Sequence, residues 1–145
     1  MRLFLMTATA AGFALASFAM NEALAVQDTP TTINGVEAVC TGVGSAKDDP
    51  RWSAYPVKIV LATSGGANLA NAHVSLAKAG KEVAGLDCDA PWILFKPPAG
   101  SYTATATLIG GSGQSHSANL TTTGSGAQKE ITITFARPPE APAGQ

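Results

Sequence analysis

The residues that could do chemistry are few, and the two histidines come first among them. His73 and His116, together with Asp87 or Asp89, are ligand types that Zn²⁺ accepts, and the two aspartates beside Cys88 could help to hold Ca²⁺. No spacing in the sequence requires these four residues to converge, because strand histidines and turn aspartates are common without any ligand. We keep them as the metal-ligand candidates and expect no bound metal and no other cofactor.

Nucleophilic and phosphate-binding motifs are missing from the sequence. No Gly-x-Ser-x-Gly stretch lies at an expected strand-to-helix turn, and the two histidines have no evident catalytic acid in register. Residues 110–113 (Gly-Gly-Ser-Gly) are followed by no lysine and no expected helix, so they do not form a phosphate-binding loop. We predict no catalytic residue and a protein that is not an enzyme.

The chain has two cysteines, Cys40 and Cys88, and we predict a disulfide between them. An even number of cysteines in an exported chain is typical of a disulfide framework. There is no Cys-x-x-Cys pair, and the carboxylates of Asp87 and Asp89 disfavour a reactive thiolate at Cys88. Two buried free thiols are the alternative.

The first residues indicate the compartment. Arg2 gives a short basic start, residues 3–20 are apolar or small, and Ala23-Leu24-Ala25 supplies the small residues that a signal peptidase reads. We therefore predict that residues 1–25 are a signal peptide cleaved after Ala25; an uncleaved membrane anchor is the alternative. The expected location is periplasmic or secreted, with no membrane insertion after cleavage.

The charge balance excludes two classes of partner. The 145 residues include 9 Lys and Arg and 10 Asp and Glu, which gives a formal net charge of −1 without any basic cluster. Binding to nucleic acid or to anionic lipid needs clustered cations that face phosphates. We expect no nucleic-acid partner.

Period-two alternation of apolar and polar residues predicts the elements that must position these side chains. It is clearest in residues 55–62, 71–76, 102–108 and 130–135, and weaker in residues 36–43 and 115–122. Residues 92–95 are apolar on both faces and predict a central strand. Glycine- and proline-rich turns separate these runs, and no helix is indicated. About seven strands predict an all-β fold, a single antiparallel β-sandwich.

Two tryptophans invite interpretation. Asp48 and Asp49 precede Pro50, which is typical of a turn, and we expect Trp52 to cover the edge of the core. Trp92 follows Cys88 closely, and we expect it to pack on the disulfide or in the core. The predicted organisation is a polar lead-in at 26–32, the sandwich at 33–136 and a proline-rich disordered tail at 137–145.

Two stretches resemble carboxypeptidase regulatory-like domains. Residues 66–76 (Gly-Ala-Asn-Leu-Ala-Asn-Ala-His-Val-Ser-Leu) are similar to the opening of such domains. Residues 97–104 (Pro-Pro-Ala-Gly-Ser-Tyr-Thr-Ala) are similar to their leucine-proline-x-glycine-x-tyrosine segment, with Pro97 where leucine is usual. The resemblance covers about residues 55–135. It implies a transthyretin-like sandwich of the kind found in small exported bacterial proteins, often an accessory module.

These observations lead to one functional hypothesis and two alternatives. We expect an exported, non-enzymatic interaction or accessory module whose partner is an envelope or extracellular protein. One alternative is a periplasmic protein that binds a small ligand or a metal near His73 or near Asp87 and Asp89. The other is a structural subunit of the envelope that assembles through its edge strands.

Overall fold

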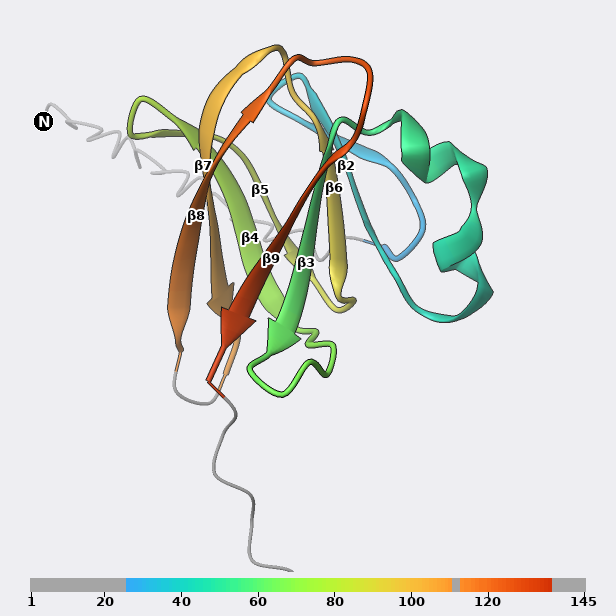
Figure 1. Cartoon of the computed structure of the whole chain (residues 1–145), viewed down its shortest axis with the longest axis vertical. Coiled ribbons are helices and arrows are strands. Elements are labelled where there is room, and N and C mark those ends of the chain that lie inside the picture. The colour runs from blue at the N-terminus through green and yellow to red at the C-terminus, as the bar shows by residue number, and fades with distance from the viewer. Residues whose placement is uncertain (1–25, 111–112, 137–145) are drawn as a thin grey trace, which may run out of the picture.

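The computed structural model describes residues 26–110 and 113–136 of the chain (Figure 1). The predicted signal peptide at 1–25, its cleavage after Ala25 and the predicted disordered tail at 137–145 lie outside the described residues. All of these therefore stay predictions.

The described residues form nine strands in two sheets (Figure 1). The five-stranded sheet has the order β1 (Thr31–Ile33), β2 (Val36–Thr41), β6 (Trp92–Lys96), β3 (Val57–Thr63) and β9 (Lys129–Phe135). The four-stranded sheet has the order β5 (Lys81–Cys88), β4 (Ala72–Lys78), β7 (Gly100–Leu108) and β8 (Ser115–Thr122). β7 and β8, which flank the glycine-rich residues 110–113, pair antiparallel.

One hydrophobic core lies between the two sheets. The alternation seen in the sequence sends every second side chain of each strand inward, so apolar residues of both sheets meet. This core includes Val57, Ile59 and Leu61 of β3, Val74 and Leu76 of β4, Ile93 and Phe95 of β6, Ala104 and Ala106 of β7, and Ile133 and Phe135 of β9. The all-β class is thus confirmed, with two sheets on a shared core as in a β-sandwich.

The number of strands differs from the prediction of about seven because β1 and β5 were missed. β1 has three residues and begins at Thr31, inside the predicted lead-in. β5 begins with Lys81 and Glu82 and contains Gly85, so only Ala84, Leu86 and Cys88 mark its buried face. Such a composition hides the alternation that identifies a strand.

The prediction of a purely antiparallel sandwich was wrong at one edge. β9 runs parallel to β3, in register from Val57 opposite Lys129 to Thr63 opposite Phe135. After β8 the chain crosses from the four-stranded sheet to the five-stranded one, and such a connection can deliver a strand in either direction. Alternation shows that β9 is half-buried but carries no information about the direction of its neighbour.

The predicted disulfide is confirmed. Cys40 on β2 is bonded to Cys88 on β5, 48 positions away, with Cα atoms 5.6 Å apart. Because β2 and β5 belong to different sheets, the bond ties one sheet to the other. A disulfide of this kind is typical of oxidising compartments.

No helix within residues 26–110 and 113–136 has the length and apolar character that crossing a membrane requires.

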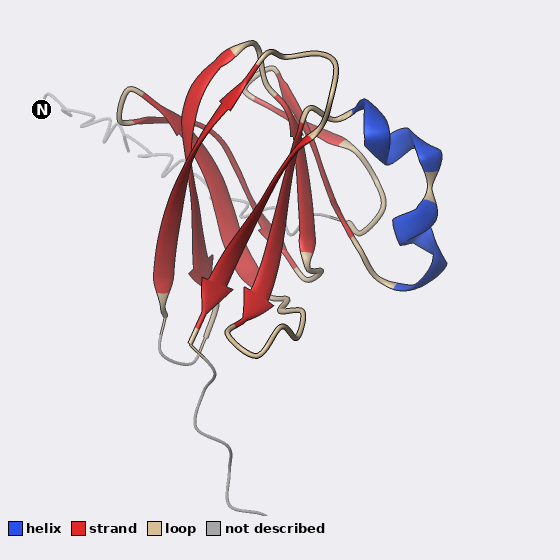
Figure 2. Cartoon of the chain, viewed as in Figure 1, coloured by secondary structure: helices blue, strands red, loops and turns tan. Residues whose placement is uncertain are grey.

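A short segment covers part of the outer face of the five-stranded sheet. Two 3-10 helices, η1 (Gly44–Asp48) and η2 (Pro50–Ala54), lie beside this sheet on the side away from the other one (Figure 2). Trp52 and Tyr55 pack on Val39 and Leu94, forming a second small core. Asp49 caps η2 by accepting a hydrogen bond from the backbone of Arg51. The expected turn is confirmed, and Trp52 covers the sheet from outside.

We expected Trp92 to pack on the disulfide or in the core, and this prediction was wrong. In β6 it is Ile93 that pairs with Cys40, so the alternation turns Trp92 to the outer face. There its ring lies against Gly42, and the ammonium of Lys58 stands 3.4 Å above the ring centre. The contact is a cation–π interaction on a half-buried tryptophan.

Candidate functional site

The outer face of the four-stranded sheet is a regular array of small polar side chains, which we call the polar face. Most inward positions of β4, β5, β7 and β8 are apolar, and the positions that alternate with them point outward. The strand registers align them in rows: Asp87, His73, Thr107 and Ser115; Gly85, Ser75, Thr105 and Ser117; Ala77, Thr103 and Asn119; Ser101 and Thr121.

Four hydrogen bonds between side chains order the β7–β8 half of the polar face. They join Thr107 to Ser115 (3.0 Å), Thr105 to Ser117 (2.7 Å), Thr103 to Asn119 (3.0 Å) and Ser101 to Thr121 (3.0 Å). Such cross-strand pairs stabilise a sheet modestly, and each hydroxyl keeps further acceptor capacity. The side chains are therefore held in place and still able to bind a polar partner.

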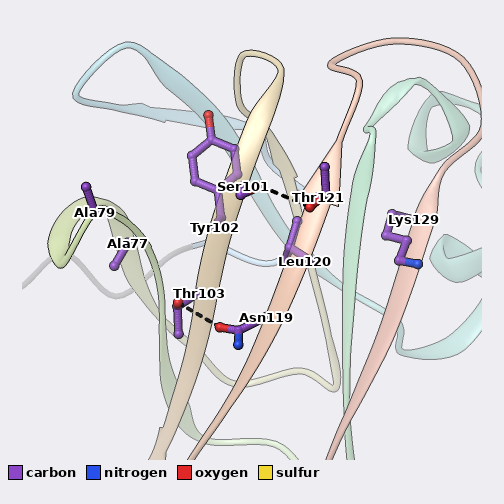
Figure 3. A pocket seen from close by; sticks show the side chains of 9 residues that line it. All are labelled: Ala77, Ala79, Ser101, Tyr102, Thr103, Asn119, Leu120, Thr121 and Lys129. Carbon is purple, nitrogen blue, oxygen red and sulfur yellow. Dashed lines mark hydrogen bonds between the residues drawn. The ribbon is translucent and has the colours of Figure 1, made fainter.

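A shallow hollow of roughly 430 Å³ lies at the end of the β7–β8 half where Ser101 meets Thr121 (Figure 3). It is lined by Ala77, Ala79, Ser101, Tyr102, Thr103, Asn119, Leu120, Thr121 and Lys129. Ligand sites for small molecules are usually enclosed and mostly apolar, whereas this hollow is open and rich in hydroxyl groups. It suits a contact with a surface better than the enclosure of a small molecule.

At the other side of the polar face, His73 lies between two carboxylates. Its Nδ1 is 2.7 Å from Oδ1 of Asp87, the residue opposite it on β5. Its Nε2 is 3.5 Å from Oε1 of Glu82. Two of the four predicted metal candidates are thus neighbours, and they share the site with Glu82, which sequence reasoning missed.

A β-bulge explains why the sequence did not reveal Glu82. The β4–β5 register shifts between Leu76 and Ala77, so that Leu76 faces Ala84 whereas Ala77 faces Glu82. Without this extra residue, alternation from Ala84 would direct Glu82 into the core; the bulge turns it outward. Alternation in the sequence carries no signal for such a shift.

Gly85 provides the space that the Glu82 side chain occupies. A Cβ built on Gly85 would collide with the Glu82 carboxylate and lie 3.2 Å from Nε2 of His73. A glycine inside a strand often marks such a close approach. The bulge and the glycine together bring Glu82 to His73.

The other two metal candidates lie elsewhere. His116 points to the inner side of β8, where its ring packs edge to face on Phe135 with centroids 5.0 Å apart. Asp89 follows β5, and its backbone carbonyl accepts a hydrogen bond from Gln27. In the part of the chain that the structure describes, no group of three or more His, Cys, Asp or Glu residues could hold a metal ion.

The His73–Asp87 pair resembles the base and orienting acid of a hydrolase, but it lacks a nucleophile. In a catalytic triad the second imidazole nitrogen faces a hydroxyl group or a thiol. Here Nε2 of His73 faces the Glu82 carboxylate, and the neighbouring Thr107 is hydrogen-bonded to Ser115. Among the described residues, the contacts of this imidazole are thus with two carboxylates, an arrangement that can bind a ligand.

Comparison with known proteins identifies no family. No protein-family model matches the chain, and no curated protein matches it.

Proposed function

We propose that this chain is an exported, non-enzymatic interaction module that binds an envelope or extracellular protein through the polar face. The observation that carries the proposal is the contrast between the two outer faces. The five-stranded sheet is partly covered by Trp52 and Tyr55 of its own chain, whereas the polar face has no such cover among the described residues. The polar face is ordered by its own hydrogen bonds and ready to meet a partner.

The chemistry of the polar face defines the partner. Its rows present hydroxyl, amide, imidazole and carboxylate groups and no aromatic or large aliphatic side chain. The partner surface must therefore be polar, because hydrogen bonds rather than apolar burial hold the two together. Carboxylates of Asp87 and Glu82 at one side and Lys129 beside the hollow at the other set its orientation through charge complementarity.

Two features support an exported and non-enzymatic role. The Cys40–Cys88 bond is typical of oxidising compartments and agrees with the predicted signal peptide. Among the described residues, Nε2 of His73 faces the Glu82 carboxylate and not a hydroxyl group or thiol, which agrees with the non-enzymatic role proposed here.

The finer fold assignment is part of the proposal. In the segment 97–104, the Tyr102 hydroxyl donates a hydrogen bond to the carbonyl of Pro98 (2.7 Å), and the Tyr102 ring is buried in the core. This tyrosine fastens the connection between β6 and β7, which belongs to the segment that carries the resemblance. The contact supports a transthyretin-like accessory domain.

Paired lysine substitutions test the proposal. We expect Thr105→Lys with Ser117→Lys, at the centre of the polar face, to remove a partner that co-purifies stoichiometrically with the wild-type protein from envelope extract. The matched control is Thr132→Lys with Thr134→Lys on the outer face of β9, which should retain that partner. Retention by the polar-face variant would contradict the proposal, as would a hydrolase activity that His73→Ala abolishes.

A further inference from the structure

The contact between His73 and Asp87 prepares one imidazole nitrogen for a ligand. When the imidazole is neutral and Nδ1–H donates to the Asp87 carboxylate 2.7 Å away, the lone pair of Nε2 is free. Histidines that bind a metal usually donate their other N–H to a carboxylate in this way, which fixes the tautomer and the ring orientation. The pair therefore has the form of a metal ligand and its supporting residue.

The distance between His73 and Glu82 fits an intervening ion better than a direct contact. Nε2 and Oε1 are 3.5 Å apart, which is beyond the usual length of an N–H···O bond. Two ligand atoms at ordinary Zn–N and Zn–O bond lengths around a tetrahedral ion lie about 3.4 Å apart. The two atoms are thus separated by the span that one such ion bridges.

Two backbone features bring the Glu82 carboxylate to this position. The β-bulge between Leu76 and Ala77 turns Glu82 from the core to the polar face, and Gly85 leaves open the space above β5. A bulge and a strand glycine each weaken a sheet, and both are common where a side chain or a ligand must be accommodated. Their coincidence at one imidazole indicates a built site.

We infer that this cluster binds one divalent transition-metal ion of the Zn²⁺ type, with Nε2 of His73 and the Glu82 carboxylate as ligands and Asp87 as the positioning residue. The imidazole ligand favours such an ion over Ca²⁺ or Mg²⁺, which take oxygen ligands. The side chains of His73 and Glu82 are 45% and 56% exposed, so water can complete the coordination. The inference goes beyond the proposed function, since the ion needs no partner protein.

Titration of untagged, disulfide-bonded protein with Zn²⁺ alone tests the inference. Isothermal titration calorimetry should show one saturable site, and NMR should show ring signals of His73 shifting while those of His116 stay unchanged. We expect His73→Gln and Glu82→Gln each to lower the affinity at least tenfold, and Asp87→Asn to lower it about 10–100-fold. His116→Gln is the matched control and should bind as the wild type does.

Three results would overturn the inference: no saturable Zn²⁺ binding, an affinity unchanged by Glu82→Gln, or equal losses in the His73 and His116 variants. The first is expected if His73 makes only its direct contacts with the two carboxylates. His73 and Glu82 are surface residues of a disulfide-linked sheet, so we expect their variants to fold. An unchanged melting temperature verifies the fold of each variant. The NMR titration uses wild-type protein, so it tests the inference even if a variant fails to fold.

Discussion

Tyr55 is a single side chain that makes the stability of the protein depend on pH. Its ring is buried, and its hydroxyl donates a hydrogen bond to Oε1 of Glu37 (2.6 Å). Burial first, and then this hydrogen bond, raise the pKa of Tyr55 above its ordinary value of about 10. The folded protein therefore keeps a proton that the unfolded chain loses in alkaline solution.

We predict that the free energy of unfolding falls as pH rises above about 10, because the unfolded state then binds fewer protons than the folded state. Tyr55→Phe should cost about 1 kcal/mol at pH 8 through the lost hydrogen bond. It should also flatten the alkaline decline, which burial of Tyr102 partly maintains, since that burial likewise raises the pKa of Tyr102. Urea unfolding at pH 8 and at pH 10–11 measures both effects. Equal declines in wild type and variant would contradict the prediction.

Part of the site could be predicted from the types of its residues. His73 and Asp87 were singled out as ligand types, and the β4–β5 register brings them together. His116 and Asp89 were singled out for the same reason, yet they lie elsewhere, because residue type does not determine the face of a strand. Glu82 was missed because its orientation depends on a bulge, which arises from the pairing of two strands and not from either strand alone.

Gly42 determines how the end of β2 packs against β6. Its φ is +107°, a conformation that favours glycine. A Cβ at this position would lie 2.6 Å from Cγ of Trp92, so the tryptophan ring could not keep its place under Lys58. A side chain introduced at position 42 would therefore cause both a steric clash and backbone strain.

We predict that Gly42→Ala destabilises the protein by about 2–4 kcal/mol, the sum of backbone strain and overpacking. Gly35→Ala is the matched control: Gly35 also has a positive φ (+81°), but a Cβ there would meet nothing within 4 Å. It should cost only about 1 kcal/mol from strain. Urea denaturation measures both variants. A cost for Gly42→Ala no greater than that of Gly35→Ala would show that the contact with Trp92 is unimportant.

The strands that alternate strongly could be predicted from the sequence, whereas pairing could not. The Thr-Ala repeat of β7 and the Ile-Thr repeat of β9 identify half-buried strands because each buried position is apolar. Only a tertiary structure reveals that β9 is parallel to β3, or that η1 and η2 fold back over the outer face of a sheet. These features depend on which surfaces meet after the local structure has formed.

The disulfide acts on the whole molecule because it joins the two sheets. Cys40 and Cys88 are 48 positions apart, so the bond restricts a long loop in the unfolded chain. On the chain-entropy model such a loop is worth about 4 kcal/mol.

We predict that the double variant Cys40→Ala, Cys88→Ala loses about 3–4 kcal/mol of unfolding free energy relative to the oxidised wild type. Urea denaturation measures the difference, and reduced wild-type protein is the control, since it should resemble the double variant. A loss below about 1 kcal/mol would mean that the bond restricts the unfolded chain little, or that the unfolded chain is already compact.

The outer faces of the two sheets differ, so the molecule as a whole is asymmetric. One sheet carries the η1–η2 segment and the Trp52 cluster, and the other presents the ordered rows of the polar face. The proposed function follows from this asymmetry, since an interaction surface requires a face that remains accessible in the folded chain. A partner should therefore touch one face and not the other.

Site-specific photo-cross-linking in the cell tests whether the partner contacts the polar face. A photoreactive residue replaces Ser117 at the centre of the polar face or, as the control, Thr132 on the outer face of β9. We expect one protein adduct of defined mass from position 117 and none from position 132. No adduct at position 117, or the same adduct from both positions, would contradict it.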